Sequence, residues 1–179
     1  MNDFRARVFG YHRKPKHDEA IQAILAKIPV FEGFSPRELA ALGRVLHRRE
    51  YLPDEVIIRQ DEPGLGMYII QSGQAAVISG HGDVELSVLH DGDFFGEVSL
   101  LDETPRSATV VARTHCQIYG FFQSDLFGLI ERDPRFGIKI VIRVAKIIGD
   151  RLRKANQQVL TLTDRVNALT ESQHSAHTR

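Results

Sequence analysis

Helical spacing of apolar residues appears near the start of the chain. Residues 1–17 show no apolar periodicity and are interpreted as a flexible basic arm, whereas in 21–28 aliphatic residues recur at helical intervals until a proline ends the pattern. A second helix is expected after Ser35, an N-cap residue followed by Pro36 in the first helical position and by Glu38, which completes a capping box. The pattern therefore predicts two short helices before any strand.

From Tyr51 to Phe122 the apolar residues follow the two-residue period and the short β-branched runs of strands. Examples are EVIIRQ, GMYIIQSG, QAAVISG, VELSVLH, SATVVA and CQIYGFF, separated by turns rich in Gly, Asp and Pro. Six or more strands at this spacing, with no helix long enough for a parallel crossover, indicate an antiparallel sandwich or jelly roll. The residues that follow Gly96 lack strand alternation and predict a single helical turn.

The C-terminal part of the chain returns to a helical pattern. A short helix is expected at 124–131, and an Asp-Pro pair separates it from a long one. We interpret 136–170 as a long, coiled-coil-like helix and the polar residues 171–179 as a frayed tail. Residues 18–135 are then expected to form one domain, with its barrel at about 51–122.

The long helix carries an apolar seam with the 3.5-residue period of a coiled coil. The seam consists of Ile138, Val141, Ala145, Ile148, Leu152, Ala155, Val159, Leu162, Val166 and Leu169. In the first two heptads the other faces are apolar too, so we expect that part to pack on the chain's own barrel. Beyond Leu152 the other faces are polar, which predicts a homodimer held together by 152–169.

Composition narrows the class of protein. With 42% hydrophobic and 26% charged residues the chain resembles globular proteins, and it has no apolar run long enough to span a membrane. The first residues are basic and lack the apolar stretch of a secretory signal, so we expect a cytoplasmic protein. Cys116 is the only cysteine, which excludes an internal disulfide and a cysteine-based metal cluster.

The net charge of zero hides an uneven distribution along the chain. Residues 51–122 carry three Lys and Arg against eleven Asp and Glu, whereas residues 131–179 carry ten against five. Two interpretations stay open at this point. The charges can be ordinary solvated faces, or an acidic barrel can dock against a basic C-terminal helix.

The segment FFGEVSLLDETPRSATVVA, residues 94–112, combines the features that an anion-binding site needs. Gly96 lets backbone N–H groups approach a phosphate closely, and a helical turn beginning at Glu97 favours negative charge at its N-terminus. Arg106 supplies positive charge and directed donors, and Ser107 adds a small donor beside it. Because Glu97 would repel a phosphate, its useful role is to accept a hydrogen bond from a sugar hydroxyl.

This segment resembles the phosphate-binding cassette of the cyclic-nucleotide-binding domain family. The family pattern is F-G-E, an aliphatic, a small residue and L, then, after a variable stretch, R, a small residue, A and a β-branched pair. FGEVSLLDETPRSATV matches it at every fixed position, and the resemblance covers about three quarters of the chain. It implies a mainly β fold, an eight-stranded antiparallel jelly-roll barrel with N-terminal helices and a long C-terminal helix.

The resemblance also implies which residues meet the ligand. Gly96 and Glu97 would contact the ribose 2′-hydroxyl, while Arg106 and Ser107 would contact the cyclic phosphate. The other candidate ligand-binding residues are Val98, Ser99 and Ala108 in the cassette, Leu86 and Ser87 at the base, and Asn156 on the long helix. Ser107, where a threonine would be the alternative, favours cyclic AMP, and cyclic GMP stays open.

These features predict a stand-alone cyclic-nucleotide sensor that signals through its C-terminal helix to a downstream protein which the sequence does not name. About ten residues follow Leu169, too few for a helix-turn-helix, so no DNA partner is expected, and no membrane partner either. His81, His90 and His115 occur singly, and no nucleophile has a marked partner, so we expect no metal, no cofactor and no enzymatic activity. The alternative function is a dimeric scaffold whose cassette no longer binds ligand.

Overall fold

The computed structural model describes residues 21–80 and 84–177, with side chains described as far as residue 169. Residues 21–25 are helical. The helices that follow are η1 (Pro29–Phe31), α2 (Pro36–Val45), η2 (Val98–Leu100), α3 (Gln123–Arg132) and α4 (Pro134–His177). The strands are β1 (His47–Tyr51), β2 (Val56–Ile58), β3 (Gly66–Ser72), β4 (Ala75–Ser79), β5 (Val84–Leu89), β6 (Phe94–Phe95), β7 (Thr109–Ala112) and β8 (Cys116–Phe122).

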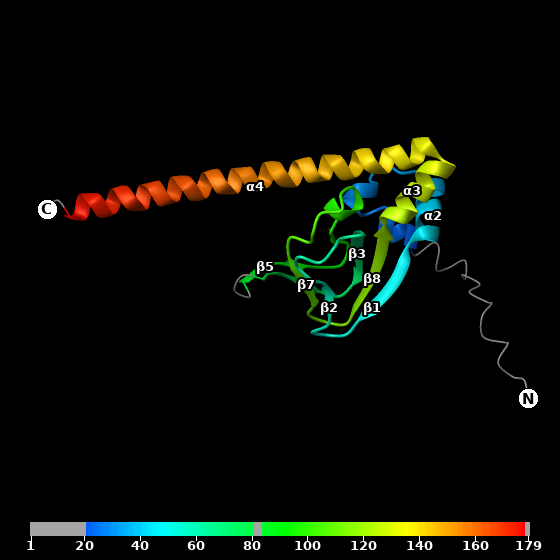
Figure 1. Ribbon diagram of the computed structural model, residues 1–179, viewed down its shortest axis with the longest axis horizontal. Coiled ribbons are helices and arrows are strands. Elements are labelled where there is room, and N and C mark those ends of the chain that lie inside the picture. Colours follow the sequence, from blue (N-terminus) through cyan, green and yellow to red (C-terminus); the bar gives the residue numbers. More distant parts are fainter. Residues whose placement is uncertain (1–20, 81–83, 178–179) are drawn as a thin grey trace, which may run out of the picture.

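Within the described residues, eight strands form two four-stranded antiparallel sheets that face each other as a jelly-roll barrel (Figure 1). One sheet has the order β1-β8-β3-β6 and the other the order β2-β7-β4-β5. The helices gather at one end of the barrel, and α4 crosses over it and continues beyond (Figure 1). The predicted fold class is therefore confirmed.

Alternation along the strands of the first sheet separates two apolar clusters. Ile69 and Tyr119 belong to the cluster that also contains the helices' buried residues, whereas their neighbours Ile70 and Ile118 belong to the cluster inside the barrel. Successive side chains of a strand point to opposite faces, so one sheet can serve both clusters. The helices are thereby fixed to the outer face of the same sheet that walls the barrel.

The start of α4 is tied to the N-terminal helices. The predicted capping box of α2 is present, and Lys139 of α4 lies 2.9 Å from the Glu38 carboxylate that forms part of it. Burial raises the pKa of Glu38, but hydrogen bonds from Lys139 and Ser35 outweigh burial and hold the pKa below its ordinary value. This contact holds the first turns of α4 in place beside the barrel.

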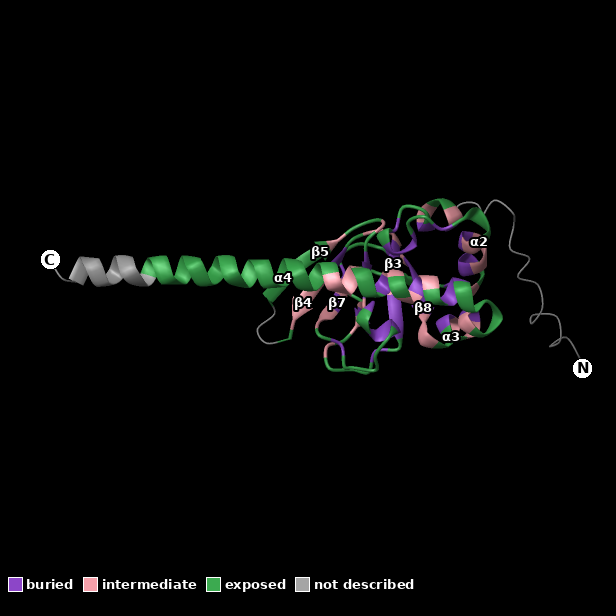
Figure 2. Ribbon diagram, turned by 90° about the horizontal axis from the view of Figure 1, so that it is seen from above, coloured by how far each residue is buried: buried purple, intermediate pink, exposed green. Residues whose placement is uncertain are grey.

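The face of α4 that packs on the barrel differs from the predicted seam. Phe136, Ile140 and Val144, spaced four residues apart, are buried, whereas the seam residue Ile138 is 52% exposed. The expectation that the first two heptads of the seam pack on the barrel therefore holds only in part, because the i, i+4 face on the barrel leaves that side of the helix outward. Figure 2 shows buried, half-buried and exposed residues alternating along α4 over the barrel, and exposed residues beyond it.

The far end of α4 extends into the segment that was expected to fray. The helix continues to His177, since neither proline nor glycine occurs between residue 150 and that point. Residues 178–179 and the expected basic arm at 1–17 lie outside the described residues. None of the helices in the described ranges is both long and apolar enough to cross a membrane.

Candidate functional site

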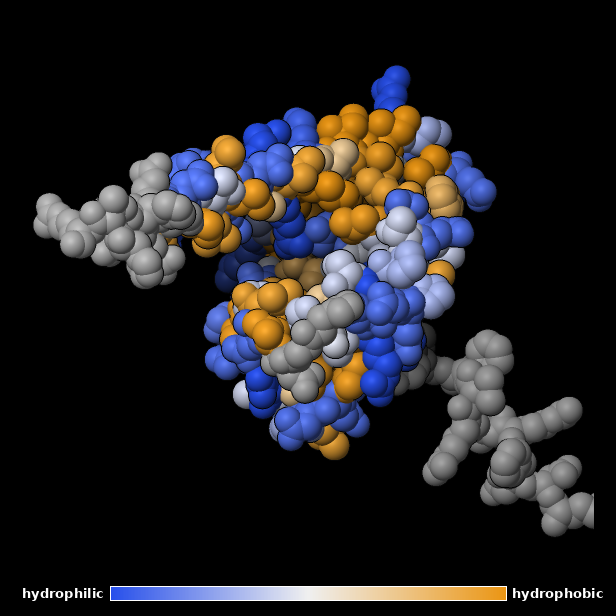
Figure 3. All heavy atoms as spheres, turned by 60° about the vertical axis from the view of Figure 1, so that its left-hand side comes forward, coloured by the Kyte–Doolittle hydropathy of each residue, from blue (hydrophilic) through white to orange (hydrophobic). Residues whose placement is uncertain are grey.

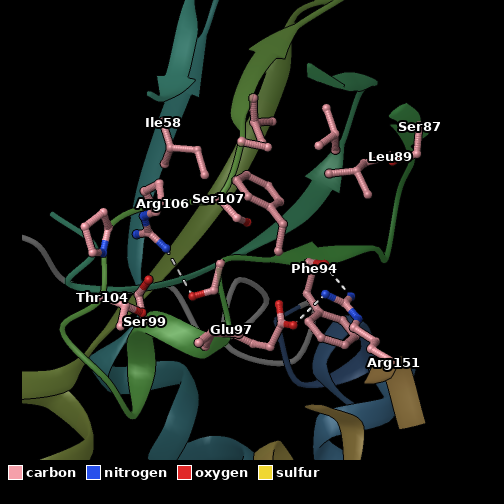
Figure 4. A pocket seen from close by; sticks show the side chains of 17 residues that line it. Ile58, Ser87, Leu89, Phe94, Glu97, Ser99, Thr104, Arg106, Ser107 and Arg151 are labelled. Atoms are coloured by element: carbon pink, nitrogen blue, oxygen red, sulfur yellow. Dashed lines mark hydrogen bonds and ion pairs between the residues drawn. The ribbon is translucent and has the colours of Figure 1, made fainter. Parts of the chain in front are cut away.

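A cavity of about 390 Å³ lies between the two sheets and is bounded by the cassette on one side (Figure 4). One wall is aliphatic and comes from β2, β4, β5 and β7, through Ile58, Val77, Leu89 and Val110. The opposite wall is polar and comes from the segment between β6 and β7. A cavity of this kind suits a ligand with an apolar base at one end and a charged group at the other.

The cassette turn starts at a glycine that the geometry requires. Gly96 has a φ of +72°, and a Cβ there would lie 2.4 Å from Nη1 of Arg106. The amide of Ser99 donates to the Gly96 carbonyl at 3.2 Å, which starts the one-turn helix η2 predicted from the sequence. The backbone at Gly96 and the guanidinium of Arg106 therefore lie closer together than a residue with a Cβ at position 96 would allow.

Arg106 is buried in the cavity wall, with 6% of its surface exposed. Its Nη2 donates to the Gly66 carbonyl at 2.8 Å and its Nη1 to the Gly96 carbonyl at 3.1 Å. A guanidinium has five N–H donors, so these two bonds leave donors for an anion. Burial lowers the pKa of Arg106, while Tyr68 and Glu97 raise it, and an arginine keeps its charge under any such influence.

The loop between β2 and β3 holds the backbone of Arg106 through two hydrogen bonds. The amide of Arg106 donates to the Glu62 carbonyl at 3.0 Å, and the Asp61 amide donates to the Arg106 carbonyl at 2.9 Å. Gly64 packs so closely that a Cβ there would lie 2.0 Å from Oγ of Ser99. This support was not predicted, although the glycines of the segment DEPGLG, residues 61–66, indicate a close backbone approach.

Glu97 is the second buried charge of the site, with 4% of its surface exposed. Its Oε1 lies 2.7 Å from Nη1 of Arg151, which reaches the cavity from α4 (Figure 4). A buried carboxylate is costly unless it is paired, so this ion pair explains how Glu97 can remain inside. Arg151 was not among the predicted site residues, because no local motif links it to the cassette.

Most of the predicted site residues line the cavity together. They are Ser87, Gly96, Glu97, Val98, Ser99, Arg106, Ser107 and Ala108.

Leu86 and Asn156 are not brought to the cavity. Leu86 is 59% exposed, since β5 alternates and turns Ser87 and Leu89 inward in its place. Asn156 is exposed, and it follows Arg151, the last residue of α4 that lines the cavity, by more than one helical turn. Among the described residues no group of three or more His, Cys, Asp and Glu side chains could hold a metal ion.

Comparison with known families identifies the domain that builds this cavity. Residues 48–133 match the family model of the cyclic nucleotide-binding domain, and this range includes the whole cassette. This chain carries a cyclic nucleotide-binding domain. A solved cyclic nucleotide-binding domain from Methylobacillus flagellatus superposes with a TM-score of 0.70 at 27% identity, covering 81% of this chain and 83% of that one.

Curated proteins are also similar in sequence, among them the following two. The cyclic AMP receptor protein of Thermus thermophilus is 33% identical over 134 residues, which are 73% of this chain and 60% of that protein. A cAMP-dependent protein kinase regulatory subunit of Colletotrichum orbiculare is 33% identical over 94 residues, 52% of this chain and 24% of that protein. The chain thus spans between about a quarter and three fifths of the length of these relatives.

Proposed function

We propose that this cyclic nucleotide-binding domain is a sensor that binds cyclic AMP in the cavity and signals through α4. The phosphate would lie on Arg106, Ser107 and the backbone of the cassette turn, and the ribose 2′-hydroxyl on Glu97. The base would lie against the aliphatic wall near Ser87 and Leu89. This role is one of binding, without catalysis, and a cytoplasmic location remains a prediction.

The observation that carries the proposal is the pair of buried charges in one cavity wall. Arg106 and Glu97 are 6% and 4% exposed, and the burial of an ionised group costs several kcal/mol unless partners compensate. Here the partners are backbone carbonyls and Arg151, which also fix the two side chains in position. Preorganised charges reduce the ordering cost of binding, whereas a scaffold without ligand needs neither charge.

Titration of the purified chain with cyclic AMP, cyclic GMP and 5′-AMP tests this ligand assignment. We expect calorimetry to give one site per chain, with cyclic AMP bound more tightly than cyclic GMP. The names of the two curated relatives and the small Ser107 both support this order. With 5′-AMP, which lacks the cyclic phosphate ester, we expect affinity at least about tenfold lower, equivalent to about 1.4 kcal/mol. Absence of heat with both cyclic nucleotides would favour the scaffold alternative.

The proposal includes a homodimer, which exposed apolar side chains along α4 support. Eight large apolar side chains among the described residues of α4 are between 49% and 66% exposed, and six of them belong to the seam: Ile138, Leu152, Val159, Leu162, Val166 and Leu169, with Ile142 and Leu160 outside it. Figure 3 shows apolar side chains gathered over the first part of α4 and recurring along its length. Val at the a positions and Leu at the d positions beyond residue 156 favour two parallel strands. We therefore propose a second copy of α4 as the occupant of this face, and the downstream protein remains unidentified.

A further inference from the structure

A second hollow, of about 530 Å³, lies outside the cavity that the cassette bounds, and the two share no lining residue. It is formed by β1, β8 and β3 of one sheet, by the loop before β3 and by the start of α3. A smaller hollow of about 150 Å³ adjoins it through shared lining residues and reaches Arg106. The residues of the second hollow that matter here are Arg49, Tyr51, Leu65, Tyr68 and Phe122.

Two aromatic rings form walls of the second hollow. The rings of Tyr68 and Phe122 stand nearly perpendicular to each other, at 88°, with their centroids 6.1 Å apart. Both side chains are only half-buried, and the neighbouring Leu65 is 62% exposed. Half-covered rings and an exposed leucine leave apolar area that a flat ligand can remove from water. The shape and the lining therefore suit a planar aromatic group.

Arg49 gives the second hollow its positive charge. Arg49 and Tyr51 are two residues apart on β1, so their side chains lie on the same face of the strand, and both line the hollow. Within the part of the chain that the structure describes, Arg49 forms no ion pair and the Tyr51 hydroxyl forms no hydrogen bond. Burial raises the pKa of Tyr51, and Tyr68 raises it further while Arg49 lowers it, so the hydroxyl keeps its proton and can donate. A guanidinium beside a hydroxyl donor suits a carboxylate.

The other charged side chains around the two hollows are already paired. Asp125, at the start of α3, lies 3.1 Å from Nε2 of His47 and accepts a hydrogen bond from the Phe122 amide at 3.0 Å. In the smaller hollow, Arg59 lies 3.9 Å from Glu62. The charge left over is therefore positive, which favours an anion over a cation. Because Asp125 already caps α3, Arg49 rather than the helix N-terminus is the group that can hold this anion.

We propose that the second hollow binds a small planar aromatic carboxylate, with the carboxylate on Arg49 and Tyr51 and the ring against Tyr68 and Phe122. A carboxylate is flat and can accept two parallel hydrogen bonds from one guanidinium, so it matches Arg49 in geometry as well as in charge. This site is separate from the cyclic-nucleotide cavity and goes beyond the function proposed for it.

Calorimetry on the full chain with 2-naphthoate and its neutral analogue 2-naphthamide tests the proposal. We expect a single naphthoate site with a dissociation constant on the order of 0.1 mM, and naphthamide bound at least about tenfold more weakly. Arg49→Gln should weaken naphthoate binding about tenfold and naphthamide binding less than about twofold, because only naphthoate carries a charge for the guanidinium. The matched control is Arg48→Gln, which should change neither affinity. Arg48 lies on the opposite face of β1 and pairs with Glu50 at 2.6 Å.

The same titration with saturating cyclic AMP present shows whether naphthoate enters the cyclic-nucleotide cavity instead. We expect naphthoate to bind with and without the nucleotide. Binding that cyclic AMP abolishes and Arg49→Gln leaves unchanged would overturn the proposal. Equal losses in Arg49→Gln and Arg48→Gln, or no binding of naphthoate at about 1 mM, would overturn it as well. If the chain does not bind cyclic AMP, the proposed function fails, and the two arginine variants still decide on this site. Thermal unfolding checks that both variants fold, which is expected because both arginines are exposed.

Discussion

Replacement of Arg106 by alanine should weaken cyclic AMP binding about a hundredfold or more. Charge-assisted hydrogen bonds contribute roughly 1.5–3 kcal/mol each, and the loss of two of them corresponds to at least that factor. Calorimetry on the variant and the unaltered chain measures the effect directly. Near-normal affinity would show that Arg106 does not bind the phosphate.

The same substitution should also lower stability, which the sequence alone did not suggest. Arg106 is buried and donates to the carbonyls of Gly66 and Gly96. Alanine leaves these carbonyls without that donor, at a cost of about 1–3 kcal/mol each where no water replaces it. Arg106→Lys retains the charge in a folded chain and should still bind more weakly, since an ammonium cannot donate in a fork.

Arg113→Ala provides a matched control for this experiment. Arg113 is another of the three arginines in 51–122, but it is exposed and pairs with Glu85 on the barrel surface. We expect its removal to leave affinity unchanged and stability within about 0.5 kcal/mol, as for most surface substitutions. An equal loss of binding in Arg113→Ala and Arg106→Ala would indicate a general effect of net charge.

Leu162→Asp should convert the proposed dimer into a monomer. Leu162 is 58% exposed on a single chain and occupies a d position of the seam. Burial of a leucine contributes about 1.5–3 kcal/mol, and both copies lose it, so the dissociation constant should rise about a hundredfold or more. Light scattering at tens of micromolar, where we expect the unaltered chain to be dimeric, measures the change.

Leu160→Asp is the control for the seam. Leu160 is 66% exposed on the same helix but lies at a b position, off the seam. Both variants replace one leucine of α4 by aspartate, and they differ only in whether that position belongs to the seam. Leu160→Asp should therefore remain a dimer. A monomeric unaltered chain, or equal effects of the two substitutions, would contradict association through the seam.

The predicted residues that the structure brings into one wall of the cavity lie close together in the sequence. The cassette from Gly96 to Ala108 could be read because the turn, the carboxylate and the arginine that build one wall of the cavity are neighbours along the chain. Ser87 and Leu86 show that the local pattern does not predict which residues of a strand point into the cavity. Apolar and polar residues alternate along β5, but which set points inward depends on the facing sheet, and the apolar Leu86 points outward.

Contacts between distant segments could not be predicted in this way. The position of Asn156 depends on where α4 leaves the barrel, and that point is set by the packing of Phe136, Ile140 and Val144 rather than by heptads. Arg151 pairs with a residue 54 positions away in the sequence, and it resembles any other charged residue of a helix surface. The useful signal was indirect, since a buried Glu97 needs a cation and Arg106, the only cation of the cassette, was assigned to the phosphate.

Hydrogen exchange of the intact chain with and without saturating cyclic AMP tests the central claim, that ligand in the cavity is sensed by α4. The cassette and α4 are joined through Arg151, and α4 follows α3 with only residue 133 between them. We predict that exchange changes both in 94–109 and in the separate span 123–160. A change confined to 94–109 would contradict the account, because the ligand would then bind without any effect on the helix.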